Sequence, residues 1–122
     1  MSITQGFRTF YMNLHHEPYC MIASGKKTIE LRLFDEKRQQ IDVGDVIIFT
    51  DSHTGECMKA KVLALHRFDS FEELYKSLPL LKCGYTEDDI DTASAADMNE
   101  YYSLEKQKKY GVVGIEICLL NE

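Results

Sequence analysis

The sequence lacks the features that mark membrane, secreted and metal-dependent proteins. It has no tryptophan and only two prolines, too few for a proline-rich linker. No apolar run approaches the roughly 18 residues of a membrane span, and residues 1–6 lack the apolar core of a signal peptide. These absences favour a cytoplasmic protein without a membrane segment.

Cysteine is scarce and scattered. The chain has four cysteines without a CxxC pair, and none belongs to a Cys/His cluster at metal-ligand spacing. Their spacing therefore predicts neither a disulfide framework nor a metal site, and no organic cofactor is implied. We expect four reduced and mostly packed thiols: Cys20, Cys57, Cys83 and Cys118.

What is present is the composition of one globular domain. The 122 residues are 44% hydrophobic and 28% charged, which are ordinary values for a folded protein. A chain of this length buries roughly two-thirds of its unfolded surface and needs no disulfide or metal to fold. We find no repeat or linker, so residues 1–122 are predicted to form a single domain.

Charge is distributed unevenly along the chain. The net charge is −6, and residues 85–105 contain seven acids and no lysine or arginine, whereas residues 26–38 contain five basic residues and three acids. Nonspecific nucleic-acid binding depends on neutralising phosphates, so this balance argues against coating of a long duplex. A short or single-nucleotide ligand agrees with it better.

Hydrophobic periodicity predicts mixed α and β structure. Alternating or apolar runs indicate five strands, near residues 8–14, 28–33, 46–50, 57–67 and 112–120. Helical spacing predicts helices that begin near Pro18 and Ser70, a short one near residues 86–91, and another over residues 98–108. Strands joined by tight turns, with helices between some of them, indicate an α+β fold: a small, mostly antiparallel barrel with flanking helices.

The strongest chemical signal lies in the turn between the first predicted helix and the second predicted strand. Gly25 fits the position after the helix end, and Lys26 and Lys27 occupy the turn. The strand then begins at Thr28. Lysines in such a turn can reach the space beside the new strand, so this turn is a candidate binding element.

Within that strand, alternation separates a polar face from an apolar one. Glu30 and Arg32 project from the same face, about 6 to 7 Å apart, and the alternate residues Ile29, Leu31 and Leu33 are expected to be buried. A Glu and an Arg so placed can pair, and the arginine fork can still take a phosphate or carboxylate. The alternative is a solvated surface ion pair, which stabilises little.

The pattern Gly25-x-Lys27-x-x-Glu30-x-Arg32 resembles the GxKxxExR signature of the ASCH domain family. The turn at residues 43–45 and the closing run at residues 110–117 resemble the family as well, so the resemblance covers nearly the whole chain. It implies a PUA-like β-barrel with a cleft suited to RNA or to a nucleotide or nucleoside. It makes Lys27 and Glu30 candidate catalytic residues, and it assigns ligand binding to Gly25, Lys26, Thr28 and Arg32.

The resemblance does not fix one activity. Some small bacterial members are amidohydrolases that deacetylate acetylated cytidine nucleosides, and they resemble G-x-K-T-I-T-x-R with a threonine as proposed nucleophile. This chain has Glu30 at that threonine's position, and a carboxylate cannot replace a hydroxyl nucleophile in the same mechanism. Thr28 lies on the same face without support from the family pattern. Other members are reported as ribonucleases, a chemistry to which a lysine beside Glu and Arg is suited.

The helix predicted over residues 98–108 supplies further candidates. Tyr101 and Tyr102 follow Met98 on one face, and Glu105 continues that stripe. Tyrosines in such a stripe are ordinarily core residues, and the carboxylate is ordinarily solvated at the rim. If the helix borders the cleft, the tyrosines can stack on a base and Glu105 can meet Lys27 or Arg32.

Three functions therefore remain open. The first is a module that binds RNA or a nucleotide-like ligand, and the second is a small hydrolase acting on a modified nucleoside or on RNA. The third is a structural or regulatory domain whose motif only braces the barrel. Ligand binding without product formation would favour the first, and product formation the second.

Overall fold

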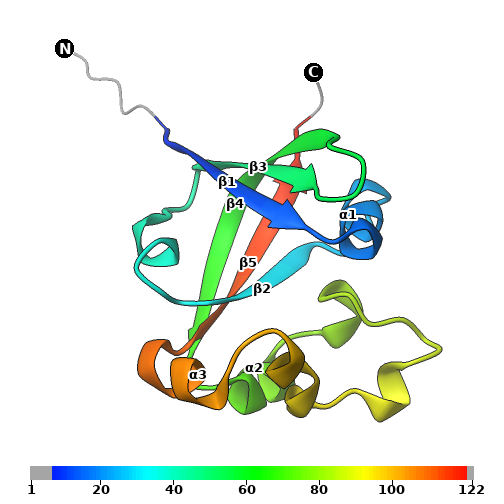
Figure 1. Cartoon of the computed structure of the whole chain (residues 1–122), viewed down its shortest axis with the longest axis vertical. Coiled ribbons are helices and arrows are strands. Elements are labelled where there is room, and N and C mark those ends of the chain that lie inside the picture. The colour runs from blue at the N-terminus through cyan, green and yellow to red at the C-terminus, as the bar shows by residue number, and fades with distance from the viewer. Residues whose placement is uncertain (1–6, 121–122) are drawn as a thin grey trace.

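Five strands form one curled, mixed sheet in the computed structural model, which describes residues 7–120 (Figure 1). The sheet order is β1-β3-β4-β5-β2. The polar N-terminal segment noted above lies outside the described residues. The strands are β1 (Thr9–Leu14), β2 (Ile29–Leu33), β3 (Val46–Asp51), β4 (Cys57–Phe68) and β5 (Val112–Leu119).

The sheet is mostly antiparallel, as predicted, but one parallel pair makes it mixed, and it forms a half-barrel rather than the barrel expected from the sequence. β1 and β3 pair in parallel, while the other three pairings are antiparallel. A parallel pair needs a long crossover connection, and here the chain between β1 and β3 forms α1 (His16–Ala23) and β2. A β-bulge between Val62 and Ala64 interrupts the β4–β5 register, and such bulges bend a strand.

Side chains connect the two outer strands of the sheet. In the described part of the chain, β1 pairs with β3 alone and β2 with β5 alone. Arg32 Nη2 on β2 donates to the backbone oxygen of Asn13 on β1 at 2.9 Å. Lys37 Nζ donates to the backbone oxygen of Tyr11 at 3.1 Å. These bonds tie the edges together without a backbone ladder.

Two apolar clusters fill the molecule. The first lies within the curl and packs α1 against the sheet, with Ile47, Phe49 and Val62 fully buried. The second lies between β2, β5 and α2 (Phe71–Ser77). As predicted, it contains Ile29, Leu31 and Leu33. Both faces of β2 are therefore covered, since Glu30 on the other face is also buried.

Helical segments pack as a layer below β2 in Figure 1. α2 begins at the Ser70 cap, whose hydroxyl accepts from the Glu73 amide as its sequence predicts. After α2 come short 3₁₀ helices and then α3 (Leu104–Tyr110). The 3₁₀ helices are η2 (Leu80–Lys82), η3 (Ile90–Thr92) and η4 (Ala95–Glu100), and η1 (Arg38–Gln40) lies in the loop after β2.

The single helix predicted over residues 98–108 is wrong. η4 ends at Glu100, and Ser103 caps a new helix by accepting from the Lys106 amide. The buried amide of Gln107 donates to the Tyr102 backbone oxygen and holds the break in place. Near residues 86–91 the chain forms a turn followed by η3 rather than a capped α-helix. None of the helices among residues 7–120 is long and apolar enough to cross a membrane.

Candidate functional site

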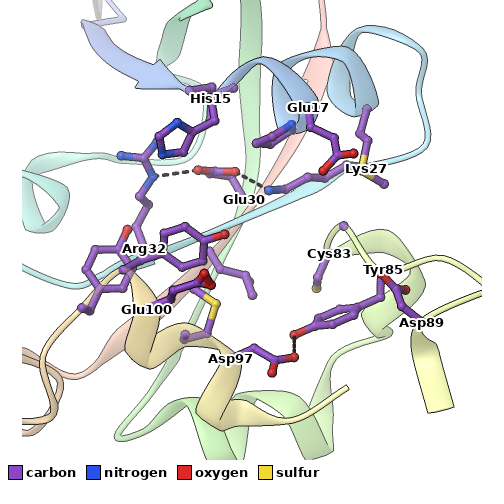
Figure 2. Close-up of a pocket in the computed structure, with 18 of the residues that line it drawn as sticks. His15, Glu17, Lys27, Glu30, Arg32, Cys83, Tyr85, Asp89, Asp97 and Glu100 are labelled. Carbon is purple, nitrogen blue, oxygen red and sulfur yellow. Dashed lines mark hydrogen bonds and ion pairs between the residues drawn. The ribbon is translucent and has the colours of Figure 1, made fainter. Parts of the chain in front are cut away.

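A cleft of about 650 Å³ lies between the β2–α1 side of the molecule and the helical layer (Figure 2). β2 supplies Glu30 and Arg32, and the segment before it supplies Lys27. The facing wall comes from α2 and from the chain between α2 and α3. The residues of that wall are Tyr75, Cys83, Gly84, Tyr85, Asp89, Asp97, Met98, Glu100, Tyr101 and Tyr102.

Glu30 is the centre of a buried charge triad. Its Oε1 lies 2.8 Å from Lys27 Nζ, and its Oε2 accepts from Arg32 Nε at 2.7 Å. The side chains of Lys27 and Arg32 are only 11% and 14% exposed, and that of Glu30 is 5% exposed. The Lys27 stem packs against Gly84, where an added Cβ would stand 3.5 Å from Lys27 Cδ. The motif residues are therefore held from both sides of the cleft.

The neighbouring charges within the triad determine the ionisation of Glu30 and Arg32. Burial alone would raise the pKa of Glu30, but the adjacent charges of Lys27 and Arg32 lower it below its usual value. Burial opposes the charged form of Arg32, and Glu30 outweighs this and raises the pKa of Arg32. Glu30 and Arg32 are therefore both charged at neutral pH. A carboxylate with a lowered pKa is a weak general base.

The opposite wall carries a chain of hydrogen bonds. The hydroxyl groups of Tyr75 and Tyr85 are 2.7 Å apart, and the Tyr85 hydroxyl donates to Asp97 Oδ2 at 2.8 Å. Burial, with the bonds to Tyr75 and Asp97, raises the pKa of Tyr85 well above its usual range. Asp97 also accepts from the Ser94 amide at the start of η4. This wall thus presents fixed oxygen atoms to the cleft.

Two tyrosines border the cleft in different ways. Tyr102 stacks on Phe71, with ring centroids 6.0 Å apart and planes at 17°, and is partly buried. Tyr101 is 59% exposed, and its ring lies 6.5 Å from that of His15 on the other side of the mouth. Tyr101 and His15 therefore place two exposed aromatic rings at the mouth of the cleft.

The cleft is acidic. Its lining contains five carboxylates against two cations, which gives a net charge of −3 with His15 neutral. Lys27 and Arg32 are already paired with Glu30. The remaining carboxylates belong to Glu17, Asp89, Asp97 and Glu100. An added phosphate would meet this negative field at close range, where Coulomb repulsion is weakly screened.

Cys83 is the thiol that faces this cleft. It is buried, and burial is the main reason that its pKa is raised to about 11. The other three cysteines are exposed, which corrects the expectation of mostly packed thiols. Among the described residues, no group of three His, Cys, Asp or Glu side chains is arranged to hold a metal ion.

The structure brings together some of the predicted site residues and separates others. Lys27, Glu30, Arg32, Tyr101 and Tyr102 line the cleft, and Gly25, Lys26, Thr28 and Glu105 do not. Gly25 and Lys26 lie in the exposed turn after α1, where Gly25 has a φ of +84°. The Thr28 amide and carbonyl both bond to other backbone groups, at Lys82 and Ile117. Glu105 is exposed in the first turn of α3, because the helix break carries it away from the stripe of Met98.

Sequence reasoning missed most of the facing wall. Tyr75, Cys83, Tyr85 and Asp97 were not singled out, and neither was His15 as a cleft residue. Asp97 was visible only as one of seven acids in an acidic segment. The signal that could have pointed to this wall is the presence of tyrosines among the carboxylates of that segment, because a purely solvated face would not need tyrosines.

A curled, mixed sheet with a charged cleft beneath β2 defines this molecule as an α+β domain. The family model of the ASCH domain matches residues 12–121. The chain therefore belongs to the ASCH domain family, as the motif at Gly25–Arg32 predicts.

Solved structures agree with this assignment. The crystal structure of the hypothetical protein PH0355 is 36% identical, with a TM-score of 0.76 over 92% of this chain and 99% of that one. The solution structure of protein PF0455 from Pyrococcus furiosus is 37% identical, with a TM-score of 0.72 over 93% and 99%. A serine-to-alanine variant of ZmASCH from Zymomonas mobilis shares the fold at 15% identity, with a TM-score of 0.62 over 91% and 72%. None of the curated proteins matches the chain.

Proposed function

We propose that the cleft binds an uncharged free nucleoside. The observation that carries this proposal is the net charge of −3 in a cleft of about 650 Å³. That volume is within the usual range for small-molecule sites, roughly 300 to 1,000 Å³. A nucleoside fits it without bringing a phosphate into the acidic field.

The two walls complement the edge of a base. Lys27 and Arg32 retain N–H groups beyond those that bind Glu30 and Asn13, because an ammonium has three donors and a guanidinium five. The facing wall supplies acceptors at Asp97 and Glu100. Nucleobases present donors and acceptors on one edge, and stacking between rings such as Tyr101 and His15 adds affinity.

Hydrolysis has less support from the side chains present. Among the described residues that line the cleft there is no serine or threonine, and the Cys83 thiol has a raised pKa that keeps it protonated. Glu30 is a weak base for activating water. A ribonuclease would also need a phosphate inside the acidic cleft. We therefore rank binding above turnover.

The first experiment compares nucleosides with their own phosphates. Purified protein is titrated calorimetrically with the four ribonucleosides, acetylated cytidine and the matching 5′-monophosphates, and each mixture is then analysed for products. We expect at least one nucleoside to bind ten-fold or more tightly than its monophosphate, without turnover. Tighter binding of the monophosphate would contradict the proposal, and product formation would establish the hydrolase alternative.

The second experiment tests the motif itself. Lys27→Ala and Arg32→Ala should each weaken binding of that nucleoside by about 1.5 to 3 kcal/mol, the usual range for a hydrogen bond to a charged group. Lys26→Ala is the matched control, since Lys26 is the adjacent lysine but is exposed outside the cleft. If both cleft variants bind like the wild type, the motif only braces the barrel.

A further inference from the structure

The outward side of α1 carries a second set of reactive groups, separate from the cleft. His16 and Cys20 lie one helical turn apart on α1, and Asp51 ends β3 beneath them. His53 follows in the turn between β3 and β4. These four residues do not line the cleft, whose α1 contacts come from Glu17, Pro18 and Met21.

Asp51 orients the imidazole of His16. The Asp51 side chain is 1% exposed, and its Oδ2 lies 2.7 Å from His16 Nδ1. Its other oxygen accepts from the His53 amide at 2.8 Å. Burial would raise the pKa of Asp51, but the bonds to His16 and the His53 amide lower it to about 2. An ionised Asp51 can only accept, so His16 Nδ1 carries a proton and Nε2 of the neutral ring is left as the basic nitrogen.

The Cys20 thiol lies against this ring. Its sulfur is 3.6 Å from His16 Nε2 and 3.9 Å from Nδ1. Because both ring nitrogens are close to the sulfur, the imidazolium formed when Nε2 takes a proton places its positive charge beside the sulfur. Thiolates are stabilised by an adjacent imidazolium, and the thiolate is the nucleophilic form. Cys20 and His16 are both exposed, so a reagent can reach them.

We propose that Cys20, with His16 as its base and Asp51 as the orienting carboxylate, is a reactive thiol that undergoes reversible exchange with small disulfides. The Cys20 thiol proton passes to the imidazole, and the thiolate attacks one sulfur of the disulfide. A new S–S bond forms on Cys20 as the old S–S bond breaks. The departing thiolate takes the proton back from the imidazolium, so the exchange consumes one disulfide and releases one thiol.

The other exposed cysteines provide internal standards. The Cys57 sulfur lies 3.3 Å from Thr50 Oγ1 and 3.7 Å from the Gly55 backbone oxygen. The Cys118 sulfur contacts the Leu119 backbone oxygen at 3.6 Å. Among the contacts described for these two thiols there is no imidazole. Cys83 is buried and its thiol has a raised pKa, so it reports unfolding rather than reactivity.

Other ionisable groups surround the pair and belong in any analysis of its pH dependence. Glu17 and Tyr19 lie on α1 itself, and His53 packs edge-on to His16 with ring centroids 5.4 Å apart. Glu56 precedes β4 and Cys57 begins it, and burial, with their charges and that of Asp51, raises the pKa of Tyr19.

The experiment measures alkylation and disulfide exchange at each cysteine of the whole, reduced protein. Iodoacetamide and, separately, oxidised glutathione are added at pH 6.5 to 9, and peptide mass spectrometry gives the rate at each site. At pH 7 we expect Cys20 to react at least ten-fold faster than Cys57 and Cys118. Its rate should keep an appreciable value at pH 6.5, where the two standards become nearly inert.

Two variants separate the imidazole effect from simple exposure. His16→Gln should bring the Cys20 rate to within about two-fold of the Cys118 rate at pH 7, and the rate should recover at pH 9, where the thiol ionises unaided. His66→Gln is the control, because it removes another imidazole paired with a carboxylate, Glu116, on a different part of the sheet. Equal rates at the three exposed cysteines, or a His16→Gln protein with an unchanged Cys20 rate, would overturn the proposal.

Discussion

At the scale of single residues, Glu30 has both a structural and a binding consequence. It holds Lys27 and Arg32 in place from the middle of β2, and it cancels one of their two charges. The two cations are nearly buried, so neither is well hydrated without it. The carboxylate that shapes the cleft therefore also prevents a large desolvation penalty.

Replacing Glu30 should expose that penalty. Glu30→Gln leaves two poorly hydrated cations without their carboxylate, and breaking a buried ion pair costs about 3 to 5 kcal/mol. We expect the free energy of unfolding, measured by urea titration at pH 7, to fall by about 3 kcal/mol. Glu17→Gln is the matched control, because Glu17 lines the same cleft but is exposed. A loss below 1 kcal/mol for Glu30→Gln would mean that the triad is solvated.

The lowered pKa of Glu30 gives a second prediction, for stability in acid. A group whose pKa is lower in the folded state stabilises the fold at pH values above its unfolded pKa, about 4.3 for glutamate. That contribution is lost as the pH falls through the lowered value. We therefore expect the stability difference between wild type and Glu30→Gln to be constant from pH 7 to about pH 5 and to shrink below pH 4. Thermal melts at closely spaced pH values measure it, and a difference that stays constant to pH 2.5 would contradict it.

The sequence predicts one wall of the cleft because the residues of that wall lie close together in the chain. Alternation along β2 places Glu30 and Arg32 on one face, and the turn before it delivers Lys27. The facing residues Tyr85 and Asp97 come from irregular chain with no period. Their positions depend on how η2 to η4 pack against α2, which no short pattern encodes.

At the scale of elements, alternation or apolar runs predicted the strands, and the Ser70 cap predicted the start of α2. The parallel partner of β1 could not be derived, since alternation indicates that a strand exists but not its neighbour. The single helix predicted over residues 98–108 does not form, because the stripe of residues on which it was based continues across the break between η4 and α3. Ser103 was read as a helical residue, although serine also favours the capping position that it occupies.

Gly111 is an element-scale position where a substitution is poorly tolerated. It ends α3 at φ 73° and ψ −172°, a region open essentially to glycine, and an added Cβ would stand 3.0 Å from the Phe68 backbone oxygen. We expect Gly111→Ala to lower the free energy of unfolding by about 2 to 3 kcal/mol. Gly55→Ala is the comparison, since Gly55 has a φ of +80° with no atom within 4 Å of the added Cβ. It should cost only about 1 kcal/mol, the conformational part. Equal losses of unfolding free energy for the two variants, measured by urea unfolding, would show that the Phe68 contact does not contribute.

At the scale of the whole molecule, charge is divided between two hollows. The cleft beneath β2 is acidic, whereas a second hollow beside α3 is lined by three cations, Arg67, Lys108 and Lys109, and one carboxylate, Asp69. The long acidic segment of the sequence thus contributes to a wall and not only to a solvated face.

Removing acidic charge from the cleft should change its preference. The double substitution Glu17→Gln with Asp89→Asn reduces the local charge from −3 to −1, so phosphate repulsion falls by about 1 kcal/mol at low salt. We expect the affinity for a 5′-monophosphate to rise about five-fold while that for the nucleoside stays within two-fold. Calorimetric titration at 20 mM and 500 mM salt measures both. A ratio of the two affinities that does not respond to the substitution would show that charge does not set the selectivity.

The pairing of β2 with β5 determines when the cleft can exist during biosynthesis. β2 leaves the ribosome early, but its sole partner in the described sheet is β5, which is made after every other element. Until then Ile29, Leu31 and Leu33 have no strand beside them. Such distant pairing slows folding because the loop must close before the contacts form. A nascent chain arrested before residue 112 therefore contains Lys27, Glu30 and Arg32 but lacks the strand that completes the sheet beside them.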